Sequence, residues 1–141
     1  MITLRKYKDE DWKAITDAVE PFSPLLPSDS FADIAKRSVA VTGVEDGEVM
    51  ACGGITFTSD EEGLVWVKVS TKCRRNSYTW ARTIKEVFNA MMDLVAELQI
   101  STYVLSDFCK GDKLARMIGL KKTSEKEEYK GNKYYKYTAV T

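Results

Sequence analysis

The chain has 141 residues, of which 44% are hydrophobic and 30% are charged, and this composition is typical of a soluble globular domain rather than a disordered segment. Its formal net charge is zero, so we expect no whole-molecule field that attracts nucleic acid or a membrane surface. It has three widely spaced cysteines and no histidine, which argues against a disulfide framework, a zinc site and any mechanism that needs an imidazole base.

The first residues of the chain, MITLRKYKDED, are polar from Leu4 onward, which is not the pattern of a signal peptide. No apolar run approaches the roughly 20 residues that span a bilayer. A reducing, cytoplasmic site of synthesis is therefore the default expectation.

The N-terminal third predicts one strand and two helices. Residues Ile2 to Tyr7 alternate in polarity and predict the strand, and Asp9 to Asp11 supply capping acids for a helix that runs to about Val19. The three prolines then break the chain into a loop. A short second helix is expected over Phe31 to Lys36.

The middle of the chain predicts three successive strands, Val39 to Val44, Val49 to Phe57 and Leu64 to Val69. Asp46-Gly47 is a strong hairpin signal between the first two. The pair Gly53-Gly54 interrupts the second strand and suggests a bulge.

A basic loop and a long helix follow these strands. Thr71 to Thr79 is the expected loop, and apolar residues spaced three and four apart predict a helix over Trp80 to Leu98. The N-terminus of a helix directs free backbone N–H groups and a positive dipole end at whatever precedes it. Since Arg74 and Arg75 are adjacent in the loop, this junction is a candidate anion site.

The remaining residues predict a strand over Ile100 to Leu105, a helix over Lys110 to Ile118, and a hairpin of Leu120 to Tyr129 with Tyr134 to Val140. Three antiparallel strands followed by β-α-β crossovers make a mixed sheet with helices on its faces. The fold class is therefore α/β (α+β), with one domain over residues 1–141.

This order of elements, with a strand, a basic loop and a long helix at its middle, resembles the GNAT superfamily (GCN5-related N-acetyltransferases) over essentially the whole chain. The resemblance implies a mixed, mainly antiparallel sheet of about six to seven strands flanked by about four helices. It also implies acetyl-CoA as cosubstrate, transfer of its acetyl group to an unidentified amine, and no metal.

In that family a strand ends in a valine and an arginine or glutamine follows, and Val69 and Arg74 match these two positions. The resemblance implies that Val67 and Val69 offer backbone groups to the pantetheine arm. It further implies that the pyrophosphate is held by Arg74, Arg75, Asn76, Ser77, Tyr78 and Thr79.

The family prefers glycine or alanine where this chain has Ser77 and Thr79. Glycine lets backbone N–H groups approach a phosphate closely, whereas Tyr78 and two added Cβ atoms crowd the same space. The hydroxyl groups and the two arginines can still donate to an anion. We therefore expect a degenerate pyrophosphate loop.

The family mechanism needs a base for the ammonium proton and an acid for the leaving thiolate. The tyrosine that often serves as the acid falls on Ala115, and Gly119-Leu120 only approximates the family's Gly-Phe. Asp107 is the candidate base, or else a capping acid for the next helix. Cys109 is the second candidate catalytic residue, or else a small semi-buried side chain.

Two other interpretations stay open. A non-catalytic GNAT-like protein with a structural or assembly role also fits the eroded loop, and small GNAT-like proteins of tailed phages, some linked to virion assembly, are similar. The segment Lys130 to Tyr137, KGNKYYKY, suits either stacking on single-stranded nucleic acid or an edge strand protected by lysines, and we favour the edge strand. A homodimer or an assembly partner is compatible with either function.

Overall fold

The computed structural model describes residues 1–17, 38–57, 59–95, 97–106, 109–129 and 131–139. The helix expected over Phe31 to Lys36 lies outside these ranges. The described elements are β1 (Ile2–Lys6), α1 (Asp9–Ala14), β2 (Ser38–Glu45), β3 (Glu48–Phe57), β4 (Glu62–Val69), the 3-10 helix η1 (Thr71–Asn76), α3 (Ser77–Leu94), β5 (Gln99–Leu105), α4 (Cys109–Met117), β6 (Leu120–Tyr129) and β7 (Asn132–Ala139).

All of the described strands join one seven-stranded sheet in the order β1-β2-β3-β4-β5-β7-β6. The β4–β5 pair is parallel and every other neighbouring pair is antiparallel. The predicted mixed, mainly antiparallel sheet is therefore confirmed. The described residues contain three α-helices and η1, slightly fewer helices than the resemblance implied.

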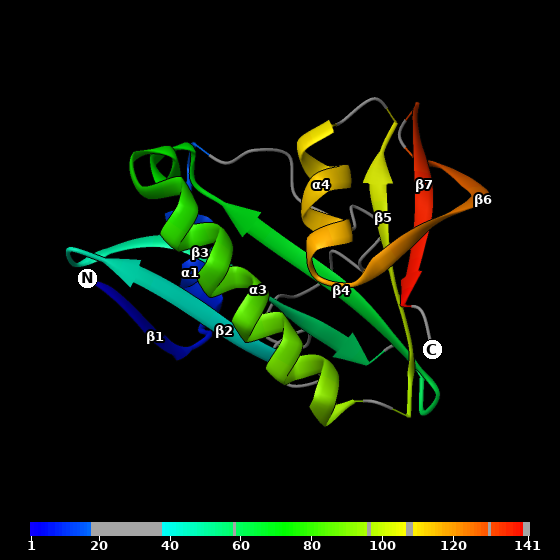
Figure 1. Ribbon diagram of the computed structural model, residues 1–141, viewed down its shortest axis with the longest axis horizontal. Coiled ribbons are helices and arrows are strands. Elements are labelled where there is room, and N and C mark those ends of the chain that lie inside the picture. Colours follow the sequence, from blue (N-terminus) through cyan, green and yellow to red (C-terminus); the bar gives the residue numbers. More distant parts are fainter. Residues whose placement is uncertain (18–37, 58, 96, 107–108, 130, 140–141) are drawn as a thin grey trace.

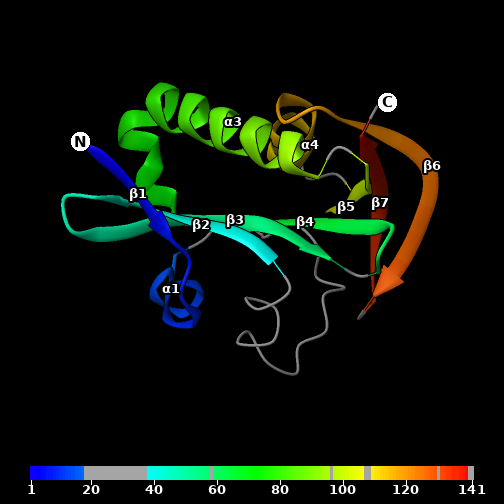
Figure 2. The ribbon, with the colours of Figure 1, turned by 90° about the horizontal axis from the view of Figure 1, so that it is seen from below.

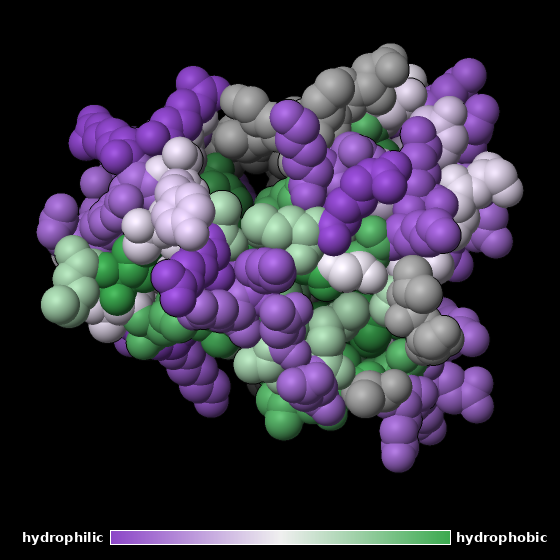
Figure 3. Space-filling model, viewed as in Figure 1, coloured by the Kyte–Doolittle hydropathy of each residue, from purple (hydrophilic) through white to green (hydrophobic). Residues whose placement is uncertain are grey.

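The helices lie in two layers on the sheet. Figure 2 shows α3 and α4 on one face and α1 on the other. Seen from the α3 side, the long helix crosses β2, β3 and β4, while α4 lies beside β5 (Figure 1). Hydrophilic side chains cover the outer surfaces of both helices on this face, and hydrophobic ones are visible between them (Figure 3).

The largest core lies between the sheet and the α3–α4 layer. Helix α3 buries its predicted apolar positions Trp80, Ile84, Phe88 and Met91, spaced four, four and three residues apart. Ile84, Phe88 and Met91 share one hydrophobic cluster with alternate residues of β4 and β5, because alternate side chains of a strand share one face. Trp80 belongs to a separate cluster with Met50, Ala51 and Cys73. A smaller cluster around Trp66 fills the space under α1.

Helix α3 starts and ends earlier than its periodicity predicted. It begins at Ser77 rather than Trp80, because residues 71–76 already form a 3-10 turn that leads into it. It ends at Leu94 rather than Leu98, where Val95 N–H bonds Met92 O at 3.2 Å. Leu94, an apolar residue within the predicted helix, is 75% exposed and so does not belong to its buried face.

The bulge predicted at Gly53-Gly54 is also misplaced. Both glycines pair in regular register with β2 and β4, and the irregularity lies between Gly43 and Val44. A Cβ on Gly54 would lie 2.2 Å from Val39 O, so this glycine allows close approach of the backbone rather than a bulge.

The last hairpin differs from its expected place as well. Strand β7 lies between β5 and β6, so β6 is the edge, and the part of KGNKYYKY that forms β7, from Asn132 onward, is interior to the sheet. Tyr134 and Tyr137 are buried. Two of the three rings considered for base stacking are therefore part of the core.

Candidate functional site

The sheet opens between β4 and β5. Their parallel pairing covers three residue pairs and ends at Leu64 opposite Ser101, although β4 continues to Val69 and β5 to Leu105. Thr102 lies at the point where the strands separate, and its hydroxyl donates to Val65 O at 2.8 Å. A side-chain bond thus replaces the next step of the backbone ladder, and the two strands diverge beyond it.

The backbone of β4 faces this opening at two of the predicted residues. Alternate residues of a strand direct their backbone groups to the same neighbouring strand. Val65 directs its carbonyl to β5, so Val67 and Val69 continue that alternation. Their backbone N–H and C=O groups therefore point into the opening, while their side chains pack in the α3-side core.

The basic loop lies directly beyond the end of β4. Arg74 and Arg75 are in the last turn of η1, and residues 74–79 are all exposed, with Tyr78 at 79%. Within the described part of the chain, neither arginine forms an ion pair. Two guanidinium groups without an ion-pair partner among the described residues thus lie beside the N-terminus of an 18-residue helix.

Three carboxylates from other elements hold this loop in place. Asp17 accepts hydrogen bonds from the hydroxyls of Ser70 and Thr71, and Glu48 forms an ion pair with Lys72. The third is Glu45, which accepts from Asn76 Nδ2 at 3.3 Å and from Trp80 Nε1 at 3.2 Å. Composition and periodicity gave no signal for these contacts, because each joins residues more than 20 positions apart.

The side chains of the two predicted catalytic residues are not among those that the structure describes. Asp107 lies outside the described residues, and Cys109 is the first residue of α4 but its side chain is not described. Ala115, a residue of α4, is completely buried and carries no hydroxyl that could enter the site. The roles assigned to Asp107 and Cys109, like those of the cofactor-binding residues, stay predictions.

A polar cluster on the β5 side of the opening was missed by the sequence reasoning. Tyr137 of β7 pairs with Thr102 of β5, and its hydroxyl donates to Asp112 on α4. Arg116 donates to the same carboxylate at 3.0 Å. Burial and the adjacent Asp112 raise the pKa of Tyr137, and the hydrogen bond from Tyr137 lowers the pKa of Asp112. The phenol therefore stays protonated and fixes α4 to β7.

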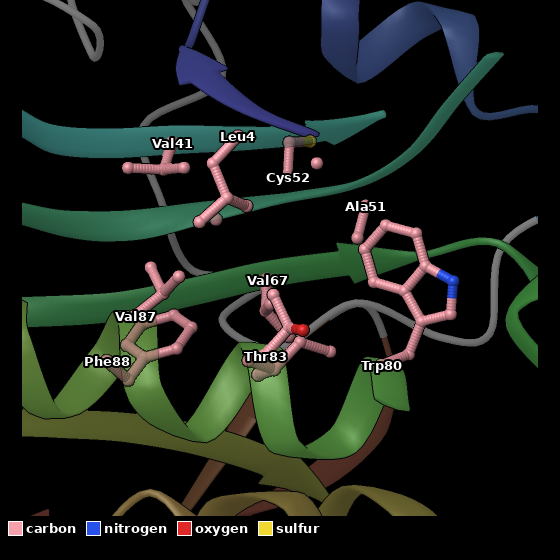
Figure 4. Close-up of a pocket in the computed structure, with 12 residues that line it drawn as sticks. Leu4, Val41, Ala51, Cys52, Val67, Trp80, Thr83, Val87 and Phe88 are labelled. Atoms are coloured by element: carbon pink, nitrogen blue, oxygen red, sulfur yellow. The ribbon is translucent and has the colours of Figure 1, made fainter. Parts of the chain in front are cut away.

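The described residues also line an apolar pocket of about 30 Å³ between α3 and strands β1 to β4. Trp80, Thr83, Val87 and Phe88 line it from the helix, and Leu4, Val41 and Val67 are among its strand residues (Figure 4). None of its lining residues comes from β5 or α4. It is therefore distinct from the opening between β4 and β5.

Comparison with known proteins adds information at the level of the fold. No family model and no curated protein sequence matches the chain. Solved structures do match it over almost its full length. The acetyltransferase of the GNAT family from Streptococcus pneumoniae superposes with a TM-score of 0.71 at 12% identity, covering 98% of each chain. The fold is that of the GNAT acetyltransferases.

Other GNAT-fold structures agree with this assignment. A GNAT family acetyltransferase from Elizabethkingia anophelis, determined with acetyl-CoA bound, has a TM-score of 0.66 at 12% identity and covers 99% of this chain and 98% of its own. The ribosomal-protein-S18-alanine N-acetyltransferase from Escherichia coli has a TM-score of 0.67 at 10% identity, and the match covers 99% of this chain and 93% of that enzyme. Such low identities establish the shared GNAT fold alone.

Two further properties of the described residues bear on the site. They contain no group of three or more Cys, Asp or Glu side chains arranged to hold a metal ion. No helix among them is long and apolar enough to cross a membrane.

Proposed function

We propose that the protein is an acyl-CoA-dependent N-acyltransferase that transfers an acetyl group from acetyl-CoA to an amine. The observation that carries this proposal is the opening between β4 and β5, which is lined by the backbone of Val67 and Val69 and ends at the basic loop. A backbone edge of this kind offers hydrogen bonds to an extended amide-containing chain. Two arginines that form no ion pair with any described residue lie at its end, and they suit the phosphates that terminate such a chain.

The residues present fit the two parts of the cosubstrate. The backbone groups of Val67 and Val69 would bind the amides of the pantetheine arm. Arg74 and Arg75, with the hydroxyls of Ser77 and Thr79 and the N-terminus of α3, would bind the pyrophosphate. Thr83 donates to the backbone carbonyl of Thr79 at 2.8 Å, a contact that does not involve the hydroxyl of Thr79.

The transfer itself requires a neutral amine. The amine nitrogen attacks the carbonyl carbon of the thioester, the carbon–sulfur bond breaks, and the thiol sulfur leaves with the bonding electrons. The excess proton on nitrogen passes to water or to a base, for which Asp107 stays the candidate. The fixed phenol of Tyr137 is a poor acid for the leaving sulfur, because Asp112 holds its proton and its pKa is raised.

One contact favours a second candidate, a non-catalytic GNAT-like protein with a structural or assembly role, such as in a phage virion. Glu45 places a carboxylate against Asn76, directly before the first residue of α3. This negative charge partly neutralises the helix dipole at the point where a pyrophosphate would bind. A chain that has lost the cofactor would tolerate such a contact.

A thermal-denaturation experiment with acetyl-CoA distinguishes the two candidates. If the ligand binds the folded state alone, a concentration of 100 times the dissociation constant adds about 2.7 kcal/mol of stability. We expect this to raise the melting temperature by several degrees, which is about the effect for a domain of this size. An unchanged melting temperature at millimolar acetyl-CoA would contradict the enzymatic proposal and favour the structural one.

A further inference from the structure

A carboxylate that follows α1 is bonded to the start of the basic loop. Oδ1 of Asp17 accepts from Ser70 Oγ at 2.8 Å, and its Oδ2 accepts from Thr71 Oγ1 at 2.7 Å. The backbone adds a third bond, from Thr71 N–H to the carbonyl of Asp17 at 3.1 Å. Two consecutive residues at the end of β4 are thus fixed by one residue that lies 53 and 54 positions earlier in the chain.

These bonds determine which way the Ser70 hydroxyl faces. Its single proton goes to Asp17, so its oxygen lone pairs are free to accept from Lys72 N–H, at 3.1 Å. That second bond caps the first turn of η1. Hydrogen bonds from Thr71 and Ser70 also lower the pKa of Asp17, so the carboxylate is charged at neutral pH.

The direction of η1 determines where the two arginines lie. Arg74 and Arg75 follow one turn after the capped residues, in the same 3-10 helix. In a glycine-rich loop the phosphate itself can order the backbone, because glycine adopts many conformations. This chain has side chains at every position from 70 to 79, so its loop geometry must come from contacts with other elements.

We propose that Asp17 is a positioning residue of the anion site: by fixing Ser70 and Thr71 it holds η1 in the orientation that brings Arg74, Arg75 and the N-terminus of α3 to one anion. This proposal rests on the proposed function, because it takes acetyl-CoA as the ligand. Asp17 acts through Ser70 and Thr71. Its own negative charge would weaken phosphate binding if it acted directly, so the two kinds of effect have opposite signs.

The variant Asp17→Asn separates positioning from a direct effect of the charge. It keeps the size of the side chain but can accept from only one of the two hydroxyls. Positioning predicts that acetyl-CoA binds about fivefold more weakly to this variant, measured by isothermal titration calorimetry. Tighter binding would overturn the proposal, because it would show that the charge acts directly. Asp93→Asn, an exposed aspartate near the other end of α3, is the matched control and should leave the dissociation constant unchanged.

A double-mutant cycle tests whether Asp17 acts through the two hydroxyls. The background is Ser70→Ala with Thr71→Val, in which Asp17 has lost its side-chain donors. Positioning predicts that Asp17→Asn has almost no further effect on acetyl-CoA affinity in this background. The same fivefold loss in both backgrounds would overturn the proposal.

Hydrogen exchange gives a readout that needs no ligand. In Asp17→Asn we expect faster exchange of the backbone amides of residues 71–76, with the amides of β5 unchanged. Unchanged exchange in residues 71–76 would overturn the proposal whether or not acetyl-CoA binds. Failure of the wild-type protein to bind acetyl-CoA would instead contradict the proposed function, and the exchange result would still decide whether Asp17 orders η1.

Discussion

The indole ring of Trp80 lies directly against Gly43, so that a Cβ on this glycine would be 2.7 Å from Cζ3 of the ring. Trp80 is 2% exposed, and its Nε1–H donates to Glu45 on the same strand as Gly43. The first turn of α3 is thereby fixed to β2 by one packed ring and one hydrogen bond. The position of the candidate anion site relative to the sheet depends on this contact.

The first prediction is that Gly43→Ala destabilises the protein by about 2 kcal/mol, because an added Cβ overpacks a site that has no space for it. Urea denaturation measures the free energy of unfolding. The cost should fall sharply in a Trp80→Leu background, where the ring is absent. An equal cost in both backgrounds would show that the indole ring is not the reason.

The second prediction concerns the two arginines of the basic loop. Replacing Arg74 and Arg75 together by alanine should weaken acetyl-CoA binding by at least about tenfold, because charge-assisted hydrogen bonds to the phosphates are lost. The control replaces Lys6 and Lys13, two exposed lysines far from the loop in sequence, and has the same change in net charge. Calorimetry at two salt concentrations should also show weaker salt dependence in the arginine variant. If both double variants bind equally well, the phosphates bind elsewhere.

The third prediction tests the point where β4 and β5 separate. Thr102→Val keeps the shape of the side chain but removes the hydroxyl that satisfies Val65 O, which should cost about 1 kcal/mol of unfolding free energy. Thr3→Val, on the exposed edge strand β1, is the control. Similar losses in the two variants would mean that the hydroxyl of Thr102 is not important to the opening.

The fourth prediction concerns stability against pH. Burial alone would raise the pKa of Asp11, but hydrogen bonds from Arg5, Thr42 and the backbone of Lys8 outweigh it and lower this pKa. A carboxyl whose pKa is lower in the folded state stabilises the fold above its unfolded pKa, near 3.9, and this stability is lost as the pH falls through the folded value.

Accordingly, Asp11→Asn should cost about 2 kcal/mol at pH 7, and the difference from wild type should shrink below about pH 4. Denaturant titrations across this range measure the effect. Glu10→Gln, an exposed acid on the same helix, is the control and should change little. A difference that stays constant down to pH 2 would contradict the linkage.

The fifth prediction is that Cys52 and Cys73 resist alkylation in the native protein. Burial raises the pKa of each thiol to about 12, with Glu45 and Asp17 contributing at Cys73. The thiolate is the reactive form, so iodoacetamide at pH 8 should leave both residues unmodified until urea is added. Peptide mass spectrometry reads each cysteine separately. Rapid native labelling of either residue would show that it is more accessible than the structure indicates.

Local patterns predicted the elements well and the contacts between distant elements poorly. The alternation of Val65, Val67 and Val69 and the spacing of Trp80, Ile84 and Phe88 are signals within a few residues, so strand β4 and helix α3 follow from them directly. The order of these elements was sufficient for the GNAT resemblance, which the solved structures confirm at the level of the fold.

The parts of the site that the sequence did not predict depend on distant contacts. Asp17 and Glu45 read as ordinary surface acids, and their contacts with the loop exist only because α1 and the β2–β3 hairpin fold back beside it. In the sequence Gly43 does not differ from any other strand glycine, and only the folded structure shows that the ring of Trp80 packs against it. Sequence patterns within one segment do not show which distant residue will contact it.

The short pairing of β5 with β4 has a consequence for the order in which the chain can fold. Strand β5 shares three residue pairs with β4 but five with β7, which follows it by nearly 30 residues. Most of its backbone hydrogen bonds therefore wait for residues 134–138. During synthesis on the ribosome the half of the sheet from β1 to β4 can form early, whereas β5 stays largely unpaired until β7 has emerged and inserted beside it.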